Sequence, residues 1–384
     1  MSRFTGPISR HSSALLCAFV LATHGTVVGA ADFALMLPGA PHSLLLDIAS
    51  AGARLVEVGE RGHILYSEDQ GQSWVQSRVP TSVMLTRVFF IDDQRGWAVG
   101  HDGNILSTAD GGVHWEMQRE GLSAQAQINE ERLARARGEV AALRGQADGT
   151  GEVGSESSDD PLQAAEHALE VARQAMADPV YPPPLMSVWF SGADQGWAAG
   201  AFGTLLRTSN GGRHWDDWSW KVNNPDELHF NGVVGDGEGN LYLASEWGTV
   251  FRSSNSGETW QAGETGYDGS FFGVLVNPAS QSVFAYGIQG TVYRSRDRGK
   301  NWEALDTPAR DSLFGATCSS AGTLVFVGDN GSAIASDDDG DHFRVLATPD
   351  RRRLTGVTAL GAGRFAATGE GGSVTLPAAA PGQR

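Results

Sequence analysis

The chain has 384 residues, with 28 Lys and Arg against 45 Asp and Glu, and a formal net charge of −17 at pH 7. This acidic balance argues against nucleic acid and anionic membrane surfaces as partners, because both carry negative charge themselves. The length is ample for one large domain, and two cysteines are too few for a disulfide-based scaffold.

The first thirty residues have the pattern of a secretory signal peptide. They contain Arg3 and Arg10 but no acidic residue, then the apolar run Ala14–Ala22, and they end in small residues at Ala30. We expect cleavage near Ala30 and a periplasmic or secreted mature chain. The apolar run is too short to span a membrane, and no later stretch is long enough, so stable membrane insertion is not expected. The mature chain would keep only Cys318, which excludes an intramolecular disulfide.

A repeat of about 40 residues runs along the rest of the chain. In each copy a Gly is followed twelve residues later by a large aromatic residue, at Gly62/Trp74, Gly103/Trp115, Gly203/Trp215, Gly248/Trp260, Gly290/Trp302 and Gly331/Phe343. Between each pair lies a hydroxyl residue, then Asp or Asn, then Gly, which we call the Asp turn. Its Asp or Asn residues are Asp69, Asp110, Asn210, Asn255, Asp297 and Asp338. A period of this length indicates a repeated supersecondary unit.

The first copy shows what one unit builds. Short apolar or alternating runs separated by Gly, Asp and Ser predict four strands, at Leu44–Ala49, Leu55–Val58, His63–Ser67 and Trp74–Ser77. Four-stranded units with this spacing are typical of β-propeller blades. We expect the Asp-turn residue to accept hydrogen bonds from backbone N–H groups of its own turn. The aromatic residue that follows should pack against a neighbouring element.

The number of units predicts an all-β fold, a seven-bladed β-propeller spanning residues 31–384. Six units are complete, and a seventh begins at Leu354 and stops after Ser373–Leu376, without a fourth strand. The apolar segment Phe33–Leu37 lies just before the first unit and has no other place in the fold. We therefore expect it to supply the missing strand and close the ring.

One insertion interrupts the repeat between the second and third units, at residues 119–181. Apolar residues recur there every three or four positions, which predicts two amphipathic helices, one with Leu133, Ala136, Val140 and Leu143 and the other with Leu162, Ala165, Leu169, Ala172 and Met176. Gly145–Asp160 is rich in Gly, Ser and acidic residues and is expected to be a flexible link, with Asp160 capping a helix that starts at Pro161. The helical hairpin is either a tolerated surface insertion or an arm for a partner, and the sequence leaves both open.

The insertion should emerge on the face that carries the turns between the second and third strands. Three consecutive blades place Phe202, Trp247 and Ile288 in those turns, so an apolar arc is expected beside the base of the helices, and Trp220 would extend it. Exposed apolar surface commonly marks a binding site. The arc is therefore a candidate surface for a protein partner, although the helices could instead fold over it.

The motif Gly-Trp-Ala-x-Gly-x-x-Gly occurs at Gly96–Gly103 and at Gly196–Gly203, each time followed by an Asp turn. The Asp turns resemble BNR or Asp-box repeats, and the combination resembles the Ycf48-like photosystem II stability and assembly factors over about residues 44–376. The resemblance implies a non-catalytic propeller without a cofactor that binds a protein, such as an envelope or membrane complex. In that family an Arg-rich patch is associated with the assisted photosystem subunit. The comparable run here is Arg351, Arg352 and Arg353, which otherwise reads as a solvated loop between blades.

Asp-box repeats also occur in sialidases and other glycosidases, so a carbohydrate-active propeller is the alternative. Sialidases need three arginines, a Tyr paired with a Glu, and an Asp, and the Phe/Tyr-Arg-Ile-Pro segment around their first Arg is absent. The histidines show no spacing typical of metal ligands, and the acidic run Asp337–Asp341 coincides with the sixth Asp turn. We therefore expect no catalytic residues, no metal and no cofactor.

Overall fold

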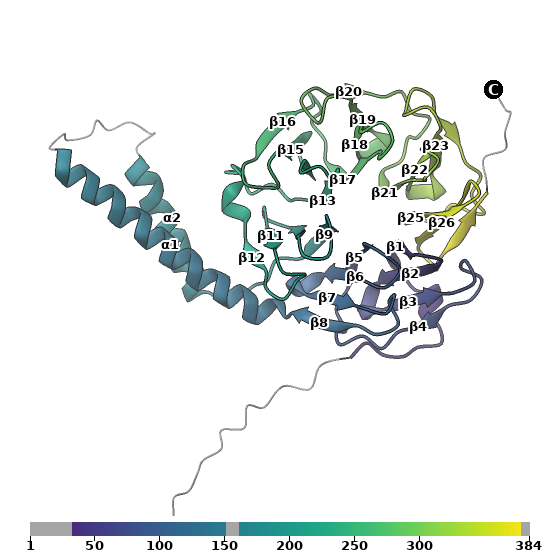
Figure 1. The fold of residues 1–384 in the computed structure, drawn as a ribbon, viewed down its shortest axis with the longest axis horizontal. Helices are drawn as coiled ribbons and strands as arrows, with labels where there is room; N and C mark the ends of the chain where they lie inside the picture. The colour runs from purple at the N-terminus through teal and green to yellow at the C-terminus, as the bar shows by residue number, and fades with distance from the viewer. Residues whose placement is uncertain (1–32, 151–160, 378–384) are drawn as a thin grey trace, which may run out of the picture. The chain divides into compact units, whose positions relative to one another are not determined.

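The computed structural model describes residues 33–150 and 161–377. Seven antiparallel sheets are arranged in a ring, six with four strands and one with three among the described residues (Figure 1). The prediction of a seven-bladed propeller is confirmed. In each blade the strands are hydrogen-bonded in sequence order, and the first strand lies at the centre of the ring.

The strands are short and regularly spaced. In blades 1 to 3 they are β1 (Leu45–Ala51), β2 (Arg54–Gly59), β3 (Ile64–Ser67), β4 (Val75–Gln76), β5 (Leu85–Phe90), β6 (Gly96–Gly100), β7 (Ile105–Thr108), β8 (Glu116–Arg119), β9 (Leu185–Phe190), β10 (Gly196–Gly200), β11 (Leu205–Thr208) and β12 (Asp216–Asp217). In blades 4 to 7 they are β13 (Gly232–Gly235), β14 (Leu241–Ala244), β15 (Thr249–Ser253), β16 (Gln261–Glu264), β17 (Phe271–Val276), β18 (Val283–Gly287), β19 (Val292–Ser295), β20 (Glu303–Ala304), β21 (Leu313–Cys318), β22 (Leu324–Gly328), β23 (Ala333–Ser336), β24 (Arg344–Val345), β25 (Leu354–Gly361), β26 (Arg364–Gly369) and β27 (Val374–Leu376).

Short 3-10 turns punctuate the blades. One precedes the first blade, η1 (Ala40–His42), and one follows β12, η4 (Ser219–Lys221). The others connect second and third strands, at η2 (Glu60–Gly62), η3 (His101–Gly103), η5 (Ile288–Gly290) and η6 (Asp329–Gly331).

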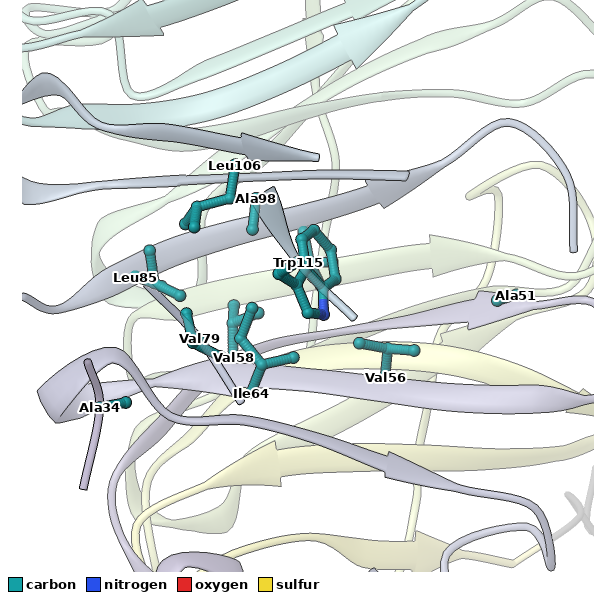
Figure 2. Close-up of a cluster of buried hydrophobic side chains, with 11 residues drawn as sticks. Ala34, Ala51, Val56, Val58, Ile64, Val79, Leu85, Ala98, Leu106 and Trp115 are labelled. Carbon is teal, nitrogen blue, oxygen red and sulfur yellow. The ribbon is translucent and has the colours of Figure 1, made fainter. Parts of the chain in front are cut away.

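The hydrophobic core is divided into layers between adjacent blades. In the first layer Val56, Val58 and Ile64 of blade 1 face Leu106 and Trp115 of blade 2 (Figure 2). The expectation that the repeated aromatic residue packs against a neighbouring element is therefore confirmed for this pair of blades. Burying such large side chains contributes about 1.5–3 kcal/mol each, which holds the blades together face to face.

The ring closes through its inner strands rather than through an added outer strand. The Thr355 side-chain hydroxyl donates to the carbonyl of Leu45 at 2.8 Å, joining β25 directly to β1. The expected pairing of Phe33–Leu37 with blade 7 is wrong. The backbone N–H of Ala34 instead donates to the carbonyl of Val79 at 3.0 Å, and that of Leu37 donates to the Gln76 side chain at 2.9 Å. The segment thus covers the outer edge of blade 1, where β4 has only two residues and leaves backbone groups to be satisfied.

The insertion forms two helices, α1 (Gly121–Thr150) and α2 (Pro161–Ala177), as predicted (Figure 1). They pack through the expected apolar residues, with Ala136, Val140, Ala165, Leu169 and Ala172 buried. The prediction of a flexible link is wrong for Gly145–Thr150, which belong to α1. The rest of that link, with the proposed cap Asp160, lies outside the described residues, as does the predicted signal peptide. Among the described helices none is long and apolar enough to cross a membrane.

Candidate functional site

The turns between the second and third strands, which we call the rim turns, share one backbone geometry. The residue directly before the last Gly of the turn has a φ of 54° to 57°, at Arg61, Asp102, Phe202, Trp247, Gln289 and Asn330. Bulky side chains rarely adopt this left-handed conformation, whereas Asn and Asp adopt it more readily. Phe202 and Trp247 nevertheless occupy it, and they are 52% and 74% exposed. Their backbone cost is therefore not offset by burial within the chain.

Both aromatic residues line one cavity of about 750 Å³, which we call the rim pocket. Its walls are the rim turns of blades 3 and 4 and the two loops on either side of blade 4, residues 222–231 and 265–270. Tyr267 supplies a third aromatic wall and His229 lies between the two blades. The pocket is thus built by four separate segments that the ring brings together.

Local contacts fix these walls. The His229 ring meets the Phe202 ring edge-on, with centroids 5.0 Å apart, and the His229 backbone N–H donates to the Glu246 carboxylate at 2.9 Å. On the other side, the Tyr267 hydroxyl donates to the Ile288 carbonyl at 3.3 Å. Trp247 stands between these two anchored walls, so the pocket is largely preformed.

The rim pocket is strongly acidic. Five carboxylates line it, those of Asp226, Glu227, Glu246, Glu264 and Asp268, and no Lys or Arg of the described chain does. None of the five forms an ion pair with another residue in the described part of the chain. Uncompensated carboxylates next to aromatic walls produce a negative local potential.

The other residues predicted for the apolar arc lie apart from the pocket. Ile288 is half-buried and contributes only its carbonyl to the Tyr267 contact. Trp220 is 56% exposed but lies against the helical hairpin, with the Arg135 guanidinium 4.9 Å from its ring centre. The structure thus brings together two of the four aromatic or apolar residues that the sequence singled out, Phe202 and Trp247.

The helical hairpin is anchored beside the pocket but does not cover it. The Arg132 guanidinium of α1 forms an ion pair with Asp217 at 2.8 Å, and the backbone N–H of Gly121 donates to the Asn104 side chain at 3.0 Å. None of the described side chains of α1 and α2 lines the rim pocket. The predicted position of the insertion on the rim-turn face is confirmed, and in this structure it leaves Phe202 and Trp247 open.

The arginine run before blade 7 is partly neutralised. Arg352 pairs with Asp350 at 2.6 Å, and Arg353 pairs with Asp329 at 2.6 Å. Arg351 is exposed. Since two of the three guanidinium groups are already engaged, the run offers less positive charge than its sequence suggests.

The Asp turns have the geometry expected of structural turns. In blade 5 the Ser295 hydroxyl donates to Asp297 at 2.8 Å and accepts from the backbone N–H of Gly299 at 2.8 Å. Hydrogen bonds, chiefly from the Asn301 side chain and backbone, lower the pKa of Asp297 to about 2. In the other five Asp turns the backbone N–H of the Gly likewise donates to the Ser or Thr hydroxyl. These carboxylates are therefore used by the fold. In the described residues no group of three or more His, Cys, Asp and Glu is placed to hold a metal ion.

Sequence reasoning missed the loop residues of the pocket, above all Asp226, Glu264, Tyr267 and Asp268. They lie in or next to connections between blades, where the repeat has no fixed spacing. The available signal was the excess of acidic residues on both sides of a rim turn that carries an exposed aromatic residue. That signal becomes specific only when the ring places both loops beside Trp247.

The comparisons with known proteins agree with this architecture. One similar solved structure is titled YCF48 bound to D1 peptide, with 15% identity, a TM-score of 0.60, and coverage of 90% of this chain and 96% of that one. Another is YCF48 from Cyanidioschyzon merolae, with 15% identity, a TM-score of 0.58, and coverage of 89% and 97%. The WD40 propeller domain of Doa1 is similar at 12% identity and a TM-score of 0.56, covering 90% and 95%.

No curated protein sequence matches the chain. The family model described as photosynthesis system II assembly factor YCF48 matches residues 65–135 and 174–380, more than half of the chain. Because this match spans more than half of the chain, the chain belongs to the photosystem II assembly factor YCF48 family.

Proposed function

We propose that the protein is a non-catalytic assembly factor that binds a protein partner through the rim pocket. The observation that carries this proposal is the pair Phe202 and Trp247, two exposed aromatic side chains held in costly left-handed conformations on the same cavity. A fold tolerates such positions at functional sites, where the gain comes from a ligand and not from the core. Exposed aromatic residues are also the usual hot spots of protein interfaces.

The family supports a protein ligand. The similar solved structure of YCF48 is bound to D1 peptide, so a propeller of this fold can hold a peptide of another protein. We propose an envelope or membrane-protein complex as the partner here, reached after export of a mature chain that begins near Ala30. The arginine run Arg351–Arg353 is a secondary contact at most, because Asp350 and Asp329 already engage two of its side chains.

The proposal excludes glycoside hydrolysis as the main activity. Among the described residues, two arginines line the cavities at the centre of the propeller, Arg87 and Arg353. Sialidase chemistry requires three. Arg87 is moreover paired with Asp47 at 3.4 Å. A panel of glycans with a hydrolysis readout tests this alternative, and clear turnover would reject the non-catalytic reading.

Site-specific cross-linking tests the protein partner. A photoreactive phenylalanine analogue placed at position 247 of the exported protein should give a discrete protein adduct in the intact envelope. The matched control places the same analogue at position 61, the equivalent rim-turn position of blade 1, where the pocket is absent. Adducts identified by mass spectrometry at 247 and not at 61 support the proposal. The absence of any adduct at 247 contradicts it.

A further inference from the structure

The rim pocket combines two properties that together define the chemistry of its ligand. Its walls carry five carboxylates without an ion-pair partner and, among the described residues, no Lys or Arg, so a cation entering it would meet negative charge. Elsewhere in the propeller Asp217 and Asp329 each have a guanidinium partner. The rim pocket is therefore a local excess of negative charge that the chain itself leaves uncompensated.

The aromatic walls favour the same kind of ligand. A Lys or Arg side chain is attracted to the face of an indole or phenol ring, and more strongly when water is excluded. The protein already uses this contact elsewhere. Arg135 lies 4.9 Å above the ring of Trp220, and Lys221 lies 4.8 Å from the same ring. Trp247, in contrast, has no cation of the described chain over its ring.

The size of the pocket indicates a peptide rather than a single amine. A volume of about 750 Å³ lies within the range of sites that enclose a ligand of several groups. The two interblade loops place Asp226 and Asp268 on opposite sides of Trp247, so carboxylates are available to more than one basic side chain.

Resting on the function proposed above, we infer that the partner presents a basic peptide segment to the rim pocket. One Lys or Arg side chain lies against Trp247 and Tyr267, while Glu264, Asp268 and Asp226 bind its charge and that of a neighbouring basic residue. The charge complementarity of the pocket selects this segment over acidic or neutral ones.

Peptide titrations test the inference. Fluorescent peptides with blocked termini and two basic residues are titrated into the mature protein, alongside peptides of the same length with Gln or Glu in place of the basic residues. The basic peptide should bind at least tenfold more tightly than the Gln peptide, and the Glu peptide should not bind. Blocked lysine amide should bind far more weakly than the basic peptide. Equal affinity of the single amino acid would overturn the peptide assignment.

Variants separate the pocket from the general negative charge of the chain. Glu264→Gln with Asp268→Asn should weaken the basic peptide about tenfold or more, and Trp247→Asn should weaken it by a similar factor. The matched control, Glu130→Gln with Glu139→Gln on exposed positions of α1, removes the same charge and should leave affinity unchanged. Equal losses in both double variants would show non-specific attraction and overturn the inference. A thermal unfolding curve for each variant checks that it is folded.

The outcome is distinguishable from failure of the proposed function. A cross-link at position 247 to a partner segment without Lys or Arg would contradict this inference and leave the protein-binding function standing. A missing cross-link, together with no peptide binding, would contradict both.

Discussion

The hydroxyl groups of Ser50 and Thr358 lie 3.1 Å apart, although 308 residues separate them in the sequence. They belong to β1 and β25, the inner strands of the first and last blades, and they mark the seam at which the ring closes. Because blade 7 has three strands in the described chain, closure depends on this inner contact. Small changes in packing at the seam should therefore lower the stability of the whole propeller.

Gly356→Ala should weaken the seam. A Cβ at this position would lie 2.8 Å from the Cα of Asp47 and 3.0 Å from the backbone nitrogen of Ile48, so blades 1 and 7 would be forced apart. We expect a loss of about 1–3 kcal/mol in the free energy of unfolding, measured by denaturant titration. Gly192→Ala is the control, because its Cβ would meet nothing within 4 Å. Equal midpoints for the two variants would show that the seam is not tightly packed.

Stability should fall as the pH rises from about 5 to 8 because of Glu57. Burial raises the pKa of this carboxyl from 4.5 to about 8 in the folded chain. Between these values the unfolded chain has lost the proton while the folded chain keeps it, so rising pH favours unfolding, and the effect levels off above about pH 8. Glu57→Gln, which cannot ionise, should flatten this part of the stability curve. Thermal unfolding across the pH range checks it, and parallel curves for the two proteins would contradict it.

Ser295→Ala should destabilise blade 5. The Ser295 hydroxyl accepts the buried backbone N–H of Gly299 at 2.8 Å, and the substitution leaves that donor without its partner. The expected loss is about 1–3 kcal/mol in chemical denaturation. Ser295→Thr is the matched control, since Thr108 accepts the N–H of Gly112 at 3.0 Å in the equivalent turn of blade 2. If the Thr variant lost as much stability as the Ala variant, the hydroxyl would not be the cause.

Trp247→Asn should leave the fold intact and stabilise it slightly, by up to about 1 kcal/mol, because Asn tolerates the left-handed conformation better than Trp does. Asn330 already occupies the equivalent position in blade 6 with a φ of 56°. Trp260→Ala, at a buried residue of the same blade, should instead cost about 3–5 kcal/mol. Denaturant titration compares the two. A large loss for Trp247→Asn would mean that its ring supports the core.

Most of the architecture could be predicted because it depends on local chemistry that repeats. The Asp turns and the Gly-x-x-Gly turns fix strand ends within a few residues, and the spacing of Ala136, Val140, Leu169 and similar residues sets the helical hairpin. The position of Phe33–Leu37 could not be derived in this way. Its apolar character indicates that it covers the edge of a sheet, but it does not indicate which blade. The open edge of blade 1 beside Gln76 is seen only in the three-dimensional structure.

The candidate site could be predicted only in part for the same reason. Phe202 and Trp247 occupy the same position in successive repeats, so the spacing of the repeat places them on the same face of the propeller. Asp226 and Asp268 lie in loops without periodicity, and their approach to Trp247 results from the angle between successive blades. Long-range proximity of this kind leaves no spacing in the chain from which it could be recognised.

The shared backbone of the rim turns has an evolutionary consequence. Six blades offer one exposed position of left-handed geometry directly before a Gly, and side chains as different as Arg61, Asp102 and Gln289 occupy it. Substituting that side chain changes the binding surface of the propeller and leaves the packing of its blades unchanged. A few substitutions in the rim turns therefore suffice to change the binding partner of a propeller with this fold.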